Sequence, residues 1–202
     1  MKDFICKDMH SLRPKIIHVG DYSYGYDHTR IAFAEEAELY IGKFCSIAYG
    51  FSIFLGGYHK IKRVSAYPFG GQHTDVFTNF PFTSMSTGKE FGTTNGDVNI
   101  ENDVYIGANV TIMSGVKVGS GAVISANSVV YTNVKPYSVV GGNPATFWFF
   151  RFNSEIIKKL LEMKWWDWSV YDINRALPFI CSENPEKLIK FYETKIIGET
   201  KL

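Results

Sequence analysis

The sequence feature that most constrains the fold is a six-residue repeat between positions 98 and 134. A β-branched apolar residue stands at every sixth position: Ile100, Ile106, Ile112, Val118, Ile124 and Val130. A second apolar or small residue follows each of these by four positions. Period six matches neither the 3.6-residue period of an α-helix nor the two-residue alternation of a simple strand. Hexapeptide repeats are typical of a parallel β-helix.

Each repeat is expected to supply one short strand and one tight turn. The β-branched side chain would point inward and stack on its counterpart in the next coil, about 4.8 Å away. Glycine and asparagine adopt turn conformations that other residues resist. The residues expected in this role are Gly107, Gly115, Gly119, Gly121, Asn102 and Asn109. One ordinary β-rich segment is the alternative, but six consecutive matches argue against it.

The repeat starts earlier in the chain and is then interrupted. Isoleucines stand six residues apart at Ile41, Ile47 and Ile53. The next position in that series is His59, and the series resumes only at Ile100. Because the interval between His59 and Ile100 is not a multiple of six, residues 60–97 are expected to leave the coil.

This excursion is rich in Phe, Gly, Thr and Pro and lacks helical periodicity. Loops of such length within a compact domain are usually functional or disordered, and the aromatic content argues against disorder. The excursion is interpreted as a flap that covers a substrate beside His59, or as a loop that packs on a neighbouring subunit. Both interpretations can hold together.

An aromatic segment precedes the first repeats. Tyr22, Tyr24 and Tyr26 alternate along it, so they would share one face of a strand. They form either a structural aromatic ladder or one wall of an acceptor pocket.

The chain changes character near residue 150. Residues 154–163 have an apolar stripe at helical spacing, with Ser154 as the expected N-cap. The tryptophans that follow are expected to pack this helix on the end of the β-helix: Trp165, Trp166 and Trp168. Shorter helices are expected near 170–177 and from Pro185 to Thr194.

The predicted organisation is therefore a β-helix domain over residues 1–150, which includes the excursion, and a helical extension over residues 151–202.

Composition suits one soluble domain, since 46% of the 202 residues are apolar and the net charge is +1. That charge excludes an electrostatic footprint for nucleic acid or an anionic membrane. No apolar run predicts a membrane span or a signal peptide. Three scattered cysteines support neither a disulfide framework nor a metal site, so a cytoplasmic protein without metal is expected.

Four sequence blocks occur in order: VGDYSYG, IGKFCSIAYG with GGYHK and SAYPFG, the repeat region, and KPYSVVGGNPA with RF and KWWDW. Together they resemble the xenobiotic acetyltransferase subfamily of hexapeptide-repeat acyltransferases, over roughly residues 18–175. That family includes chloramphenicol and streptogramin acetyltransferases and acetyltransferases of surface-polysaccharide sugars. The resemblance implies a left-handed parallel β-helix with a C-terminal helical segment. It also implies a homotrimer that binds acetyl-CoA between subunits.

The resemblance identifies a general base as well. In this family a histidine at the start of the excursion has that role, and His59 occupies the position here. An imidazole, with a reference pKa of about 6.5, can take the proton of a hydroxyl or amine as it attacks a thioester near neutral pH. The interruption of an apolar series at the base of a flap favours catalysis over a structural role for His59. His73, inside the flap, is a minor rival.

By the same resemblance, the pantetheine arm pairs with backbone groups at successive turns, where small residues let the backbone come close. The implied contacts are Gly107, Ser125, Ala126, Asn143 and Pro144. Basic residues usually follow this last turn in the family and serve the CoA phosphates. Here residues 147–150 are aromatic and only Arg151 remains, with Lys117 and Lys135 as further candidates. Adenine stacking on the aromatic residues and a surface salt bridge at Arg151 are the alternatives.

The acceptor is the least constrained component. The aromatic candidates for binding it are Tyr24, Tyr67 and Phe80. Basic residues after His59, from Lys60 to Arg63, would suit an anionic acceptor such as a nucleotide-linked sugar, or would form a solvated face. The favoured function is acetyl-CoA-dependent transfer to a sugar in surface-polysaccharide biosynthesis. The alternatives are an antibiotic O-acetyltransferase of the chloramphenicol or streptogramin type and a non-catalytic hexapeptide-repeat binding protein.

Overall fold

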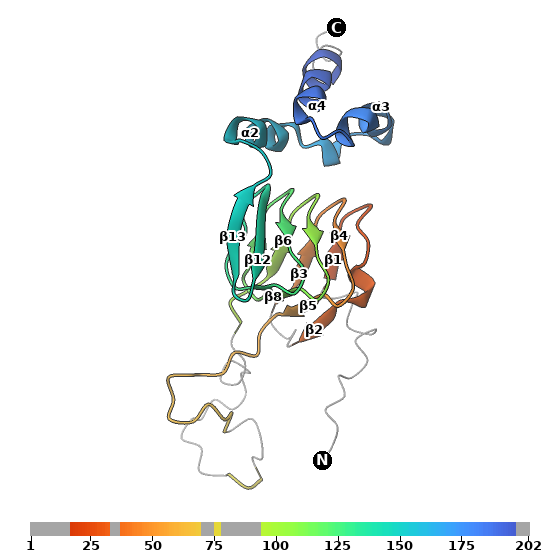
Figure 1. Ribbon diagram of the computed structural model, residues 1–202. Helices are drawn as coiled ribbons and strands as arrows, with labels where there is room; N and C mark the ends of the chain where they lie inside the picture. The colour runs from red at the N-terminus through yellow and green to blue at the C-terminus, as the bar shows by residue number, and fades with distance from the viewer. Residues whose placement is uncertain (1–16, 33–36, 70–74, 78–93, 197–202) are drawn as a thin grey trace.

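The computed structural model describes residues 17–32, 37–69, 75–77 and 94–196. Their strands form three sheets, which the chain visits in turn (Figure 1). Sheet A contains β1 (Ile17–Val19), β3 (Leu39–Ile41), β6 (Val98–Ile100) and β9 (Lys117–Val118). Sheet B contains β4 (Ser46–Ile47), β7 (Tyr105–Ile106), β10 (Val123–Ile124), β12 (Ser138–Gly142) and β13 (Ala145–Phe150). Sheet C contains β2 (Arg30–Ala32), β5 (Ser52–Phe54), β8 (Thr111–Met113) and β11 (Val129–Val130).

The register of the sheets follows the six-residue repeat. Ile100 of β6 lies opposite Val118 of β9, and Ile112 of β8 lies opposite Val130 of β11. One coil of the chain therefore takes 18 residues, or three repeats. Four of the predicted inward positions are fully buried, with 0% exposure: Ile106, Ile112, Val118 and Ile124. The prediction of a parallel β-helix is confirmed.

The chain bends at three corners, which we name after the sheets that they join. The A–B corner contains residues 42–45, 101–104, 119–122 and 135–137, and the C–A corner contains residues 55–59, 114–116 and 131–133. The B–C corner contains residues 48–51, 107–110 and 125–128. In the last coil the hairpin turn 143–144, which joins β12 to β13 within sheet B, takes the place of this corner and is counted with it. Asn109 and Gly115 supply positive φ angles of 57° and 77° at two of these bends. Gly107 is required for close approach instead, because a Cβ there would lie 2.5 Å from the Ala126 nitrogen.

The excursion leaves the coil after β5. Ser52 of β5 lies opposite Thr111 of β8, an offset of 59 residues where the regular coil has 18. Sheet C therefore continues from β5 to β8 as though the excursion were not there. Figure 1 shows the described part of the excursion extending from the side of the coil opposite the C-terminal helices.

The C-terminal helices cover the A–B corner. They are α2 (Ser154–Met163), the 3₁₀ turn η2 (Trp165–Asp167), α3 (Val170–Ile180), α4 (Pro185–Phe191) and the π-helical turn η3 (Tyr192–Ile196). Trp165 and Trp166 are buried, and the Trp165 ring lies 4.9 Å from the ring of Phe44 at this corner. The tryptophans thus dock the helices on the coil as predicted, but along its side rather than on its end (Figure 1). Among the described residues, none of the helices has the length and apolar character needed to span a membrane.

Two details of the sequence interpretation are wrong. Asn153, not Ser154, caps α2, because its Oδ1 accepts the backbone N–H of Ile156 at 2.9 Å. The three alternating tyrosines also do not share a face. Tyr22 bends the chain with a φ of 64° and stacks on Phe44, and Tyr26 begins the 3₁₀ helix η1 (Tyr26–His28). The turn before η1 breaks the strand alternation on which the prediction rested.

Candidate active site

His59 lies at the C–A corner, where the excursion begins, and its side chain is exposed. Its Nδ1 lies 2.7 Å from the carbonyl oxygen of Ala66. Because a carbonyl oxygen can only accept, the Nδ1–H must be the donor. The neutral ring therefore carries its lone pair on Nε2, which is the arrangement that a general base requires.

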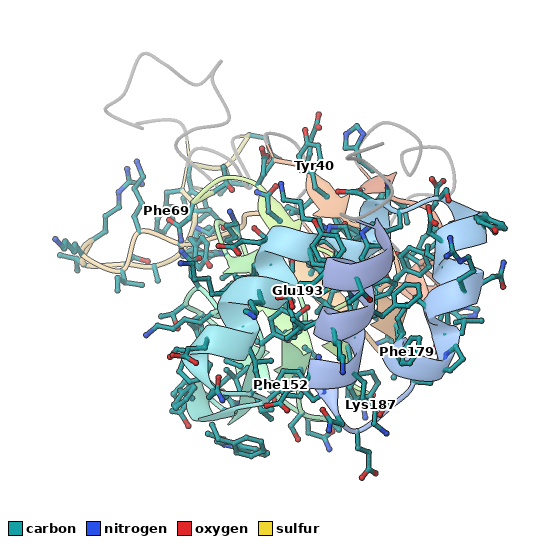
Figure 2. All side chains as sticks on the ribbon, turned by 90° about the horizontal axis from the view of Figure 1, so that it is seen from above. Tyr40, Phe69, Phe152, Phe179, Lys187 and Glu193 are labelled. Atoms are coloured by element: carbon teal, nitrogen blue, oxygen red, sulfur yellow. The ribbon has the colours of Figure 1, made fainter. Side chains whose placement is uncertain are left out.

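The residues after His59 fold back beside it. Tyr67 lines a hollow of only about 10 Å³ next to the imidazole, which is barely enough room for one water molecule. The Tyr67 ring packs 4.7 Å from the ring of Phe69, and Phe69 meets Phe77 edge-on at 5.1 Å. Figure 2 shows Phe69 to one side of the C-terminal helices. Tyr67 is thus close to His59, but this described stretch does not by itself enclose a substrate.

The other predicted acceptor residues lie elsewhere. Tyr24 forms an isolated parallel β-bridge with Ser46 of β4, and the Ser46 hydroxyl donates to the Tyr24 hydroxyl. Its ring is exposed. Phe80 and the rival base His73 lie outside the described residues.

Five of the predicted cofactor residues gather at the B–C corner, one coil above the next. They are Gly107, Ser125, Ala126, Asn143 and Pro144. The backbone N–H of Gly107 donates to the Ile124 carbonyl at 2.9 Å, and that of Ser125 donates to the Val140 carbonyl at 2.9 Å. These bonds hold successive turns in register along the coil. The corner therefore presents a continuous edge of small residues to which an extended arm could bind.

Arg151 is separate from this corner. It follows the last residue of β13, about 20 Å along the strand from Asn143 and Pro144. Its Nη1 donates to the Gly121 carbonyl at 2.6 Å, and its guanidinium lies 5.4 Å from the centre of the Tyr137 ring. Arg151 is thus engaged at the A–B corner, beneath the C-terminal helices. The structure does not bring it together with the other predicted cofactor residues.

The predicted base and the predicted cofactor residues lie at different corners of one chain. His59 lies at the C–A corner and Ser125 lies at the B–C corner, with sheet C between them. The described part of one chain therefore presents the predicted base and the predicted cofactor residues at separate corners.

Comparison with known proteins identifies the family. Residues 97–132 match the family described as bacterial transferase hexapeptide (six repeats). Chloramphenicol acetyltransferase from Klebsiella aerogenes is 38% identical over 194 residues, which cover 87% of each chain. Virginiamycin A acetyltransferase from Staphylococcus aureus is 38% identical over 208 residues, which cover 96% of this chain and 91% of the relative.

The chain belongs to the xenobiotic acetyltransferase subfamily of hexapeptide-repeat acyltransferases. A solved hexapeptide-repeat acetyltransferase from Vibrio cholerae is 25% identical, with a TM-score of 0.49, and the match covers 68% of this chain and 64% of that one. The resemblance inferred from the sequence blocks is confirmed, and the protein is an acetyltransferase.

This acetyltransferase contains a half-buried carboxyl group that sequence reasoning missed. Asp103 lies at the A–B corner beside a cavity of about 190 Å³ that Arg151 and Leu160 also line. Burial raises the pKa of Asp103 to about 6, although the charge of Arg151 opposes the rise. In the repeat, Asp103 occupies an ordinary turn position. The C-terminal helices that cover this corner shield it from solvent, and no periodicity in the repeat predicts those helices.

The two lysines considered for the CoA phosphates lie in different surroundings. Lys117, one of the two lysines considered for CoA, lies 2.9 Å from the Glu101 carboxylate, and this hydrogen bond raises the pKa of Lys117. Lys135 instead lines a cavity of about 300 Å³ with Phe147 and Phe150. Within the described residues, no group of three or more His, Cys, Asp or Glu side chains is arranged to hold a metal ion.

Proposed function

We propose that this acetyltransferase moves the acetyl group of acetyl-CoA to a hydroxyl group of an antibiotic, with His59 as the general base. The observation that carries the proposal is the hydrogen bond from His59 Nδ1–H to the Ala66 carbonyl at 2.7 Å. It holds the ring at the start of the excursion and leaves Nε2 as a proton acceptor.

The reaction that this geometry supports is a direct transfer. Nε2 of His59 takes the hydroxyl proton as the acceptor oxygen bonds to the thioester carbonyl carbon. The carbon–sulfur bond then breaks, and the protonated imidazole returns the proton to the CoA thiolate. No enzyme-bound acetyl group is needed, because the thioester is already activated. Most of the acceleration would come from holding the two substrates together.

The acceptor class rests on the curated relatives. Those reported above are a chloramphenicol and a virginiamycin acetyltransferase, and a probable macrolide acetyltransferase from Lysinibacillus sphaericus is 40% identical over 166 residues. The relatives thus favour the antibiotic alternative over the sugar acceptor that was preferred from the sequence. A non-catalytic binding protein has no support among them.

The cofactor arm is proposed to run along the B–C corner, past Gly107, Ser125 and Ala126 to Asn143 and Pro144. Its amides would pair with backbone groups of successive coils, which lie about 4.8 Å apart. Because His59 is at another corner, we propose that a second copy supplies it and that the enzyme is a homotrimer with left-handed coils. A cytoplasmic location belongs to the same proposal, since acetyl-CoA is a metabolite of that compartment.

The test is an assay of CoA thiol release from acetyl-CoA in the presence of single acceptors. Chloramphenicol, a virginiamycin and a macrolide form one set, and maltose and a nucleotide-linked sugar form the other. We expect acceptor-dependent thiol release with at least one antibiotic, and an acetylated product by mass spectrometry. Turnover of a sugar alone, or of no acceptor, would contradict the proposed substrate class.

A further inference from the structure

A cavity of about 190 Å³ lies between the A–B corner of the coil and the C-terminal helices that stand over it (Figure 1). Its polar side comes from the corner and from the residue after β13, namely Asp103, Tyr137 and Arg151. Its apolar side comes from the helices and includes Leu160 of α2 and Leu188 of α4. Since a cavity of about 150 Å³ holds benzene, this one has room for roughly eight non-hydrogen atoms.

Asp103 and Arg151 carry opposite charges, but they form no ion pair with each other or with any other described residue. The guanidinium of Arg151 has one hydrogen bond, from Nη1 to the Gly121 carbonyl at 2.6 Å. The two charges are nevertheless near each other, since Arg151 opposes the rise in the pKa of Asp103 to about 6. At neutral pH the cavity therefore presents a negative and a positive group that are both available to a ligand.

Tyr137 adds a hydrogen-bond donor that lacks an acceptor. It is only 2% exposed, and its hydroxyl has no hydrogen-bond partner among the described residues. Burial raises the pKa of Tyr137, so the hydroxyl keeps its proton at neutral pH. The nearby indole of Trp165 and the guanidinium of Arg151 are donors too, so neither can accept that proton. Native proteins rarely leave a buried hydroxyl unpaired, so Tyr137 indicates a missing acceptor at this cavity.

These three groups suit a ligand that carries both charges. An ammonium group would pair with Asp103, and a carboxylate would accept hydrogen bonds from Arg151 and Tyr137. A simple cation would be repelled by Arg151, and a simple anion would be repelled by Asp103. A neutral ligand would leave both charges unpaired. The apolar part of the ligand would lie against Leu160 and Leu188.

We propose that this cavity binds a small apolar α-amino acid, such as valine, in its zwitterionic form. Valine has the size that the volume allows. The ligand would touch both the coil and the helices, so its binding would stabilise the packing of one on the other. The site does not depend on the proposed function, because it lies at a different corner from His59 and from the proposed cofactor edge.

Calorimetric titration of the full-length enzyme with L-valine tests the ligand class. We expect saturable binding of one L-valine per chain. Two analogues each lack one charge, since valinamide has no carboxylate and 3-methylbutanoate has no ammonium group. Each analogue should bind at least about tenfold more weakly than L-valine. L-Valine should also raise the melting temperature of the enzyme, because it binds the folded state.

Three variants test the site itself. Asp103→Asn keeps the size of the side chain but removes its charge, so L-valine binding should weaken by about tenfold or more. Tyr137→Phe removes only the hydroxyl and should weaken binding about fivefold. Asp167→Asn is the matched control, because Asp167 pairs with Lys43 at 2.9 Å and does not line the cavity. It should bind L-valine as the wild type does. Melting curves without ligand establish that each variant is folded.

Four results would overturn the inference. Valinamide that binds as tightly as L-valine would make the cavity a site for cations, and 3-methylbutanoate that does so would make it a site for anions. No saturable binding of L-valine at millimolar concentrations would mean that the cavity holds only water. Equal affinity in Asp103→Asn and the wild type would place the bound amino acid elsewhere. The proposed function survives all four results, since none of these measurements involves acetyl-CoA.

Discussion

His59 and Asp103 are both titratable side chains at corners of the coil, yet their surroundings differ. His59 is exposed at the start of the excursion and is held by one backbone carbonyl. Asp103 lies under the C-terminal helices, where burial raises its pKa to about 6. The first arrangement suits proton transfer at neutral pH, whereas the second places a charge where solvation is poor. Substitution of His59 should therefore change the reaction rate, and substitution of Asp103 should change the stability.

His59→Ala should abolish proton transfer while the coil stays intact. Loss of a general base typically lowers kcat by about 10²- to 10⁴-fold. The CoA dissociation constant should barely change, because the proposed contacts with the pantetheine arm are backbone groups at another corner. The melting temperature should also stay within a few degrees, since the imidazole is exposed. Near-normal turnover in a well-folded variant would remove His59 from the mechanism, and His73 would be tested next.

Asp103→Asn should stabilise the protein at neutral pH. In the folded protein the pKa is raised from 3.8 to about 6, so the folded state binds the proton more tightly than the unfolded state. The stability due to the protonated carboxyl is complete below about pH 4 and is lost as the pH rises to about 6. By pH 7 the poorly solvated charge costs at most about 3 kcal/mol, which the amide would remove.

Urea unfolding at pH 4.5 and pH 7.5 measures this effect for both proteins. The wild type should lose stability between these pH values relative to Asp103→Asn, and the variant should be more stable at pH 7.5. A variant that is less stable at pH 7.5 would show that the attraction between Asp103 and Arg151 outweighs the cost of burial.

At the scale of elements, the sequence predicted most of what is regular. The strands from β6 to β11 follow from the spacing of Ile100 and the residues after it, because one buried position recurs in every repeat. The exit of the chain near His59 follows from the same spacing. The antiparallel β12–β13 hairpin was not predicted, since the aromatic run at 147–150 continues no repeat. Its strands are defined by pairing with each other, which a periodic pattern does not encode.

The candidate site was predictable only in part, for a similar reason. Gly107 and Ala126 come together because a fixed 18-residue coil stacks their turns, so their proximity follows from the repeat. Arg151 was grouped with them by its position in the chain. Because β13 is long, Arg151 lies at a different corner. There it donates to the Gly121 carbonyl and lies over the Tyr137 ring. Non-local contacts of this kind cannot be read from a motif.

Ile112→Asp tests the register of the coil. Ile112 is 0% exposed and is paired with Ile53 and Val130 of the neighbouring coils. A carboxylate there has no partner, so the free energy of unfolding should fall by several kcal/mol. Thr111→Asp, on the same strand but facing outward, is the matched control and should cost much less. Equal melting temperatures for the two variants would mean that the inward face is assigned wrongly.

At the scale of the whole molecule, the three corners of the coil have three different occupants. The A–B corner carries the C-terminal helices, which bury Trp165 and Trp166 and add a second apolar core to that of the coil. The B–C corner is lined by the small residues of the proposed cofactor edge. The C–A corner carries His59 and the excursion. Within one chain the B–C corner and the C–A corner lie apart, so the proposed reaction depends on how copies of the chain are arranged.

This arrangement can be tested by mixing two inactive variants. His59→Ala removes the base, and Ala126→Trp places a bulky side chain on the exposed B–C corner, where it should block the cofactor arm. In a cyclic trimer, each site would combine His59 of one copy with the B–C corner of the next. Random mixing in equal amounts should then leave roughly a quarter of all sites with both parts intact, which is about one site in each mixed trimer. The two variants, co-expressed with different tags and purified through both, should regain acetyl transfer that neither has alone. Sedimentation should show three chains per particle. A purified mixed particle without activity would place the whole site within one chain, and a catalytically active monomer would contradict the trimer itself.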